Sequence, residues 1–169
     1  MIELQNKILD KKQILQKTRR IAFEIYENNF EEKEIILAGV YDRGYHFAEM
    51  LKTELERISN ITIILVKISL EKFSSSQNDI SLDCSKELLV NKSIVVVDDV
   101  LNTGRTLIYC LKPFLELEIK SLQTAVIVDR SHRLFPISAN YTGYALSTTF
   151  QEHIHVILDN EENFGVYLH

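Results

Sequence analysis

Apolar side chains occur along this chain in two patterns that follow one another, helical spacing and short continuous runs. Residues 10–28 repeat them at helical spacing, with most of the charged side chains on the opposite face, which predicts an amphipathic helix. Residues 35–40 form a short apolar run that predicts a strand. A second amphipathic helix is expected next, with apolar positions at Phe47, Ala48, Leu51 and Leu55. A strand followed by a polar loop and a helix is the repeating unit of α/β proteins.

Predicted strands and a further helix follow along the rest of the chain. Apolar runs predict further strands at residues 61–70, 94–97 and 122–128. A helix containing Leu107, Ile108, Leu111 and Leu115 separates the last two runs, bent or interrupted at Pro113. Alternation in residues 154–158 and 164–168 predicts a C-terminal β-hairpin. We therefore expect an α/β fold, with a mainly parallel twisted sheet, flanking helices and this terminal hairpin.

Composition limits the classes of protein that this chain can belong to. With 169 residues, of which 46% are hydrophobic, the chain is expected to form a single domain over residues 1–169. Its formal net charge of −5 provides no overall attraction for RNA, DNA or anionic membranes, although a local basic face could still exist. No signal peptide opens the sequence and no apolar run approaches ~20 residues, so we expect a cytoplasmic protein with no membrane partner.

The strand at residues 94–97 leads into a group of residues suited to bind a phosphorylated sugar. Two adjacent carboxylates, Asp98 and Asp99, can accept hydrogen bonds from vicinal hydroxyls or hold a hydrated Mg²⁺ through water. The segment 103–106 reads Thr-Gly-Arg-Thr where the next helix should begin. Unpaired backbone N–H groups and the positive end of the helix dipole favour a phosphate there. The alternative is an exposed turn followed by a threonine helix cap.

This segment resembles the phosphoribosyl-pyrophosphate (PRPP) signature of type I phosphoribosyltransferases. The shared pattern is four apolar residues, two acidic residues, two apolar residues, any residue, and then Thr-Gly-Arg-Thr. The resemblance implies that Asp98 and Asp99 hold the ribose hydroxyls. It also implies that the 5′-phosphate is wrapped by Asn102, Thr103, Gly104, Arg105 and Thr106.

A second candidate anion site follows the strand at residues 35–40. Gly39 and Gly44 allow a sharp turn or a close approach to a ligand, and Arg43 adds a permanently charged donor. In the resembled family this is the pyrophosphate loop, and Arg43 joins Asp98 and Asp99 as a catalytic candidate. The corresponding residues are Val40, Tyr41, Asp42, Arg43 and Gly44, where Asp42 replaces a more usual neutral hydroxyl. Without the resemblance, the segment is equally well an ordinary turn between a strand and a helix.

Residues 71–83 are polar and show no periodicity, which predicts a mobile loop. Type I enzymes carry a flexible lid at this position, which closes over PRPP and excludes water. Lys72 is the only basic residue of this segment, whereas the family's lids are more basic. Lys67 in the preceding strand stands where related sequences tend to be acidic. A long surface loop without a catalytic role is the alternative.

The last third of the chain resembles one branch of that family. Residues 128–133 and 139–143, together with residues 20–25 and the loop 39–44, are similar to the bacterial pyrimidine-operon attenuation proteins that are also uracil phosphoribosyltransferases. In that branch the loop after this strand presents backbone groups to the pyrimidine. The candidate base-binding residues are therefore Asp129, Arg130, Ser131, His132 and Arg133. Taken alone, His132 is equally well a surface histidine.

The implied reaction converts uracil and PRPP to UMP and pyrophosphate, with Mg²⁺ chelated by PRPP and water and no direct metal ligand on the protein. Purine enzymes of the class often carry an acidic residue at the position of Asn102, and its absence favours a pyrimidine. Two alternatives remain: a nucleotide-sensing regulator of pyrimidine genes that binds mRNA, and a nucleotide-binding relative without catalysis. RNA is disfavoured by the net charge. A homodimer or higher homo-oligomer is left open.

Overall fold

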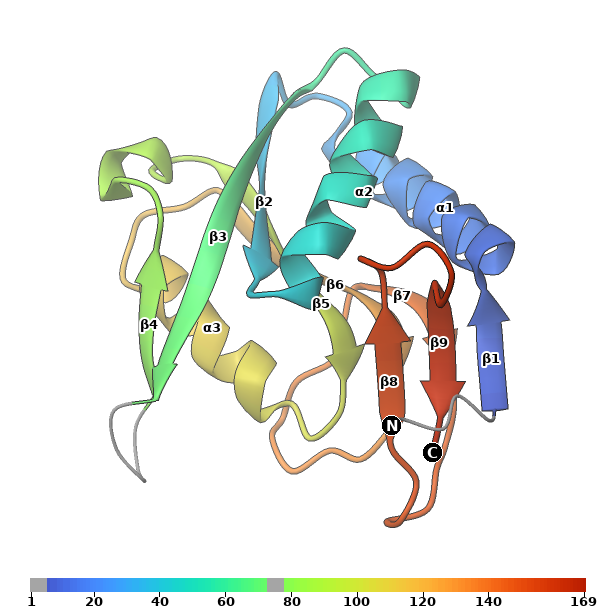
Figure 1. The fold of residues 1–169 in the computed structure, drawn as a ribbon. Coiled ribbons are helices and arrows are strands. Elements are labelled where there is room, and N and C mark those ends of the chain that lie inside the picture. The colour runs from blue at the N-terminus through green and yellow to red at the C-terminus, as the bar shows by residue number, and fades with distance from the viewer. Residues whose placement is uncertain (1–5, 73–77) are drawn as a thin grey trace.

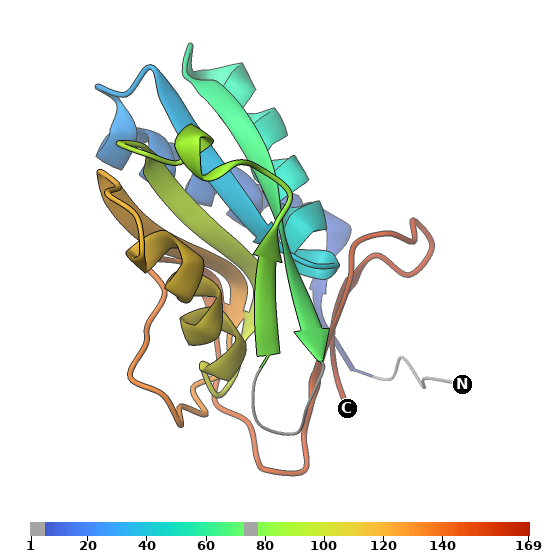
Figure 2. The same cartoon turned by 90° about the vertical axis from the view of Figure 1, so that its left-hand side faces the viewer.

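The computed structural model describes residues 6–72 and 78–169, and its centre is a six-stranded sheet in the order β4-β3-β2-β5-β6-β7 (Figures 1 and 2). Five strands run parallel: β2 (Glu34–Val40), β3 (Thr62–Lys72), β5 (Ser93–Leu101), β6 (Ser121–Asp129) and β7 (Tyr141–Ala145). The edge strand β4 (Asn78–Leu82) pairs antiparallel with β3. The mainly parallel α/β sheet expected from the sequence is confirmed.

Three helices cover the two faces of this sheet. Helices α1 (Lys11–Asn29) and α2 (Arg43–Ile58) lie on one face, and α3 (Arg105–Leu115) lies on the other (Figure 1). The first helix begins where the sequence pattern indicates, because Asp10 and Gln13 form a reciprocal capping box. The last helix continues for two residues beyond Pro113. A short 3-10 helix, η1 (Lys86–Leu88), precedes β5.

Each face of the sheet has its own hydrophobic core. On the face of α1 and α2, the core includes Ile21, Phe47 and Leu51, all fully or almost fully buried. On the other face, Phe114 of α3 packs with side chains such as Ile94 and Val96 of β5. Because β5 is covered on both faces, its sequence is a continuous apolar run rather than an alternating one. This explains why residues 94–97 could be recognised as a buried strand.

A second, three-stranded sheet lies beside the carboxyl ends of the main strands. It contains β1 (Asn6–Asp10), β9 (Gly165–Leu168) and β8 (Ile154–Ile157), in that order and all antiparallel (Figure 1). The predicted terminal hairpin of β8 and β9 is confirmed, whereas β1 was not predicted. We call this three-stranded sheet the hood. No helix within the described residues is long and apolar enough to cross a bilayer.

Two boundaries differ from the sequence prediction. The predicted loop at residues 71–83 is in part a β-hairpin, because β3 extends to Lys72 and residues 78–82 pair with it. Ile80 and Leu82 contact the second core, but two alternating apolar residues were too short a signal. Residues 73–77 of the proposed lid at 71–83 lie outside the described residues. Strand β5 also continues past Val97 to Leu101, which is buried.

Candidate functional site

The loops that contain the candidate residues all follow the carboxyl ends of neighbouring parallel strands. Strands β2, β5 and β6 are adjacent in the sheet and run in the same direction. Arg43 is the first residue of α2 after β2, Thr103 to Thr106 span the turn after β5 and the start of α3, and Asp129 to Arg133 span the end of β6 and the loop after it. In open α/β sheets, ligands bind at this edge. The fold therefore brings the three predicted segments to one side of the molecule (Figure 1).

The two carboxylates at the end of β5 have different surroundings. Asp98 is only 8% exposed and accepts a hydrogen bond of 2.8 Å from the N–H of Asp99. Burial, reinforced by the negative charge of Asp99, raises the pKa of Asp98 well above its ordinary value. The Asp99 side chain is more open and accepts the N–H of Val100 at 2.8 Å. Asp99 is therefore the better placed of the two to meet a ligand as an anion.

The start of α2 packs directly against this end of β5. A Cβ atom on Gly44 would lie 2.6 Å from the carbonyl oxygen of Val97 and 2.9 Å from the Cα of Asp98, so only glycine allows this approach. The approach brings the guanidinium of Arg43 to 3.8 Å from the carboxylate of Asp99. The Arg43 guanidinium, which follows β2, and the Asp99 carboxylate at the end of β5 thus lie beside each other at this edge of the sheet.

The loop between β2 and α2 makes a sharp turn. The peptide bond between Tyr41 and Asp42 is cis, and a Cβ on Gly39 would lie 2.5 Å from the Cα of Tyr45. The ammonium group of Lys67 lies over the rings of Tyr41 and Tyr45, at 5.5 and 4.6 Å from their centroids. Lys67, an unusual residue for its position in β3, therefore adds a positive charge beside this loop.

The loop after β5 ends in a glycine with left-handed geometry at the start of α3. Gly104 has a φ of 88° and is the N-cap residue. The first hydrogen bond of this helix runs from Ile108 N–H to the Gly104 carbonyl, at 3.0 Å. The N–H groups of the preceding turn are consequently not used by the helix and can donate to an anion. Within this turn the N–H of Arg105 donates to the Thr103 hydroxyl at 3.3 Å, and a phosphate at residues 103–106 stays a prediction.

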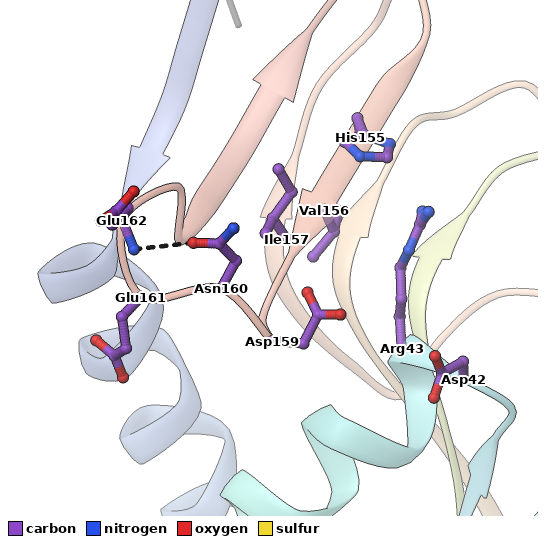
Figure 3. Close-up of a pocket in the computed structure, with 9 residues that line it drawn as sticks. All are labelled: Asp42, Arg43, His155, Val156, Ile157, Asp159, Asn160, Glu161 and Glu162. Atoms are coloured by element: carbon purple, nitrogen blue, oxygen red, sulfur yellow. Dashed lines mark hydrogen bonds between the residues drawn. The ribbon is translucent and has the colours of Figure 1, made fainter. Parts of the chain in front are cut away.

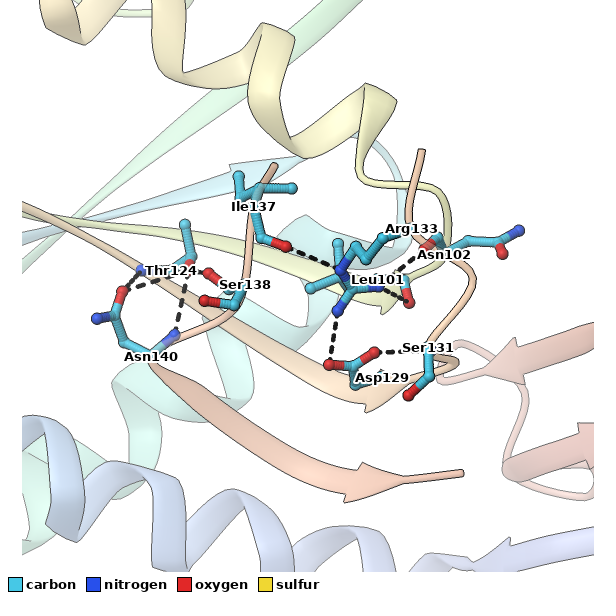
Figure 4. A network of polar contacts seen from close by, with 9 residues as sticks. All are labelled: Leu101, Asn102, Thr124, Asp129, Ser131, Arg133, Ile137, Ser138 and Asn140. Atoms are coloured by element: carbon cyan, nitrogen blue, oxygen red, sulfur yellow. Dashed lines mark hydrogen bonds and ion pairs between the residues drawn. The ribbon is translucent and has the colours of Figure 1, made fainter. Parts of the chain in front are cut away.

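The loop after β6 is connected by hydrogen bonds to the loop after β5. The backbone N–H groups of Leu134 and Phe135 donate to the carbonyl of Thr103, at 2.8 and 3.1 Å. Arg133 donates to the carboxylate of Asp129 at 2.6 Å and to the carbonyl of Asn102 at 2.8 Å (Figure 4). These contacts fix the two loops relative to each other.

Side chains in the loop after β6 are mostly occupied by internal contacts. Asp129 accepts the N–H of Ser131 at 2.9 Å as well as the Arg133 guanidinium (Figure 4). The ring of His132 lies 2.6 Å, through Nε2, from the carbonyl of Thr148. Since a carbonyl only accepts, that nitrogen must carry a proton.

Arg130 is 4% exposed, so its side chain is buried in the protein and does not lie at the surface where a base would bind. It donates to Asn102 Oδ1 at 3.3 Å and to the Thr149 carbonyl at 2.9 Å. It also donates to the Thr148 hydroxyl and to the Glu152 carbonyl. The side chain of Arg130 is therefore engaged in contacts within the protein.

A cavity of about 810 Å³ lies between the start of α2 and the hood (Figure 3). Asp42 and Arg43 form its inner side, and the hood contributes His155 and Asp159 among others. Sequence reasoning did not find His155. Its position in a short strand more than 100 residues from Arg43 gives no local signal, and only the packing of the hood brings it here.

Comparison with known proteins agrees with this geometry. The family model described as phosphoribosyl transferase domain matches residues 5–160. The bifunctional protein PyrR of Bacillus pumilus is 35% identical over 161 residues, which cover 90% of this chain and 89% of that protein. The bifunctional protein PyrR of Macrococcus caseolyticus is 33% identical, with 95% of this chain and 97% of that protein covered.

Solved structures share the fold at lower identity. The hypoxanthine phosphoribosyltransferase of Trypanosoma cruzi superimposes with a TM-score of 0.79 and 19% identity, over 97% of this chain and 95% of that one. A hypoxanthine-guanine phosphoribosyltransferase of Bacillus anthracis gives a TM-score of 0.73 at 23% identity, over 88% and 87%. The chain therefore belongs to the type I phosphoribosyltransferase family, and its similarity over nearly its whole length is to the bifunctional PyrR proteins within that family.

Proposed function

We propose that this chain, acting as one catalytic domain, transfers the 5-phosphoribosyl group of PRPP to uracil and so forms UMP and pyrophosphate. The observation that supports this most directly is the arrangement at the end of β5. Two carboxylates there are followed by a glycine-capped helix start, and one of them, Asp99, lies 3.8 Å from the guanidinium of Arg43. PRPP has vicinal hydroxyls, a 5′-phosphate and a pyrophosphate, and each of these groups has a matching partner in this arrangement.

The proposed roles follow from the position of each group. The N–H groups at the start of α3 and the hydroxyls of Thr103 and Thr106 hold the 5′-phosphate. Asp98 and Asp99 accept hydrogen bonds from the ribose hydroxyls, with Asp99 the more accessible. Arg43 and the neighbouring loop amides stabilise the pyrophosphate as it leaves. The protein thus accelerates the reaction by positioning and charge stabilisation, without a covalent intermediate.

Magnesium is proposed to arrive with PRPP rather than on a dedicated protein site. Among residues 6–72 and 78–169, no three His, Cys, Asp or Glu side chains converge as metal ligands. Mg²⁺ readily retains several waters and binds through substrate phosphates together with one or two carboxylates. The partly open carboxylate of Asp99 suits such a contact through water. When bound, the ion would offset the negative charge of the pyrophosphate group.

The choice of uracil rests on the loops beside the ribose site. The side chain of Asn102 accepts a hydrogen bond from Arg130, which orients it, and an acidic partner for a purine is missing at this position. The backbone of residues 130–136, held by the contacts of Asp129 and Arg133, would read the edge of the base. A fixed polar edge can reject the wrong base strongly, because the wrong base leaves buried groups unpaired.

An assay of PRPP-dependent pyrophosphate release tests this proposal with uracil, orotate, hypoxanthine, guanine and adenine as acceptors. The proposal expects uracil to give the highest kcat/KM, and expects Asp99→Asn to lower it at least about tenfold, equivalent to ~1.4 kcal/mol. Lys112→Gln, on α3, is a matched surface control that should leave the rate unchanged. Faster turnover with hypoxanthine would contradict the choice of base. UMP binding without turnover on any base would instead favour a nucleotide-sensing regulator.

A further inference from the structure

The cavity between α2 and the hood has Arg43 and His155 at one end, beside Asp42, and a group of acidic side chains at the other. Arg43 and His155 lie close together at the inner end, where the Arg43 guanidinium points toward the His155 ring (Figure 3). Asp159, Glu161 and Glu162, from the turn between β8 and β9, line the other end. Glu161 is already paired with Lys11 of α1. A ligand of high negative charge is therefore expected only at the Arg43 end.

His155 is held at this place by the strand to which it belongs. Its neighbours Ile154 and Val156 both pack into the hydrophobic core on the face of α1 and α2, and Val156 is almost fully buried. Strand β8 is paired along its length with β9. The ring centroids of His155 and His169 lie 5.9 Å apart. The backbone of His169 is held by two hydrogen bonds to the backbone of His153. His155 is thus a positioned side chain.

The charges around His155 come from every element packed against it. They are Asp42 just before α2, Arg43 at the start of α2, Asp99 of β5, Asp159 of the hairpin turn, and His169 beyond β9. Partial burial and then the positive charge of Arg43 lower the pKa of His155, outweighing the opposite effect of Asp99 and Asp159. In the free protein His155 is therefore neutral near pH 7.

We propose that His155 is a second cationic contact for the pyrophosphate group, and that it takes up a proton from solvent when the polyanion binds beside Arg43. This rests on the proposed function, because it places pyrophosphate at the loop containing Arg43. Several negative charges near the ring reverse the local balance that disfavours the imidazolium. The polyanion then meets the imidazolium of His155 in addition to the guanidinium of Arg43. Binding of pyrophosphate and proton uptake are consequently linked.

Titration calorimetry with magnesium pyrophosphate tests this in the wild-type chain and in His155→Asn. At pH 8 the two proteins should bind within about twofold of each other, because His155 is neutral in both the free and the bound state. At pH 6 the wild type should bind about fivefold more tightly, because binding is linked there to protonation of His155. Buffers of different ionisation enthalpy should show extra proton uptake by the wild type near pH 7. The control variant His153→Asn changes an exposed histidine two residues earlier, and it should show the affinity and proton uptake of the wild type.

The outcomes separate this inference from the proposed function. Equal pH dependence and equal proton uptake in the wild type and His155→Asn would overturn the role of His155, while pyrophosphate binding itself would still support the proposed function. A wild-type chain that binds neither magnesium pyrophosphate nor PRPP would contradict both. Melting temperatures of all variants confirm folding, and His155→Gln serves as a second neutral variant if His155→Asn is unstable.

Discussion

Arg130 donates a hydrogen bond of 3.3 Å to the side-chain oxygen of Asn102, and so joins the loop after β6 to the loop after β5. The same guanidinium holds the segment 148–152 through three further acceptors. Because Arg130 is almost completely buried, these four contacts are its role in the folded protein. The family resemblance makes Arg130 a base-binding candidate, and in the structure its side chain connects three loops.

Arg130→Lys tests this positioning role. A lysine has one compact donor group in place of a planar fork, so several buried acceptors lose their partner. We expect a loss of about 2–3 kcal/mol of unfolding free energy, or about 4–10 °C in Tm. We also expect a larger rise in KM for uracil than for PRPP. The same substitution at the exposed Arg19 is the control. An unchanged Tm for Arg130→Lys would show that its hydrogen bonds are not needed.

Gly44→Ala tests the contact between α2 and β5. The added methyl group meets backbone atoms of Val97 and Asp98 at less than 3 Å, so the helix start must move and take Arg43 with it. We expect pyrophosphate affinity to fall at least about tenfold, equivalent to ~1.4 kcal/mol. Gly165→Ala, whose methyl group would crowd the Leu9 carbonyl in the hood, separates general destabilisation from displacement of Arg43. If Gly44→Ala binds pyrophosphate as tightly as the wild type, the glycine is not needed at this contact.

Asp98 gives the protein a specific dependence of stability on pH. Its pKa is higher in the folded than in the unfolded chain, so its contribution is fully present below the unfolded pKa and is lost as the pH rises through the folded pKa. Asp98→Asn removes this loss. We expect the Tm difference between the variant and the wild type to become more positive from pH 4 to pH 8, although the variant binds PRPP less well. Each unit of pKa shift corresponds to about 1.4 kcal/mol. A Tm difference that does not change with pH would contradict the buried-carboxyl account.

RNA binding is expected to be weak, because internal contacts occupy much of the basic surface on α1. Lys11 pairs with Glu161, Lys17 lies over the Tyr144 ring, and Arg20 donates to the carbonyls of Thr142 and Gly143. Phosphate neutralisation by free cations supplies most of the non-specific affinity for nucleic acid. A gel-shift assay with the RNA leader of the chain's own operon checks this. Submicromolar binding at physiological salt, enhanced by UMP, would favour the regulatory alternative.

The sequence predicted most of the sheet because its central strands are buried on both faces and form unbroken apolar runs. Strand β1 was not predicted because its five residues gain their stability from β9, almost 160 residues later. Strand β7 was missed for a related reason, since it pairs only with β6. Such pairings depend on the tertiary fold, and a local pattern contains little information about them.

The candidate site could be located from the sequence more accurately than its individual contacts. Asp98, Asp99 and Gly104 follow a recognisable strand, so their placement at its carboxyl end was predictable. The inward direction of Arg130 was not, because it depends on acceptors in residues 148–152. His155 likewise meets Arg43 only through the packing of the hood on the main domain.

The affinity for PRPP, measured by calorimetry in the presence of Mg²⁺, tests the central claim most directly. Gly104→Val is the sharpest variant, because its φ of 88° disfavours valine and an added Cβ would lie 2.5 Å from a methyl carbon of Ile137. The second variant replaces Asp98 and Asp99 together with alanine. If PRPP binds at the loop after β5, both variants should lose at least about tenfold in affinity, or ~1.4 kcal/mol. Folded variants that bind PRPP as tightly as the wild type would contradict the assignment of this site.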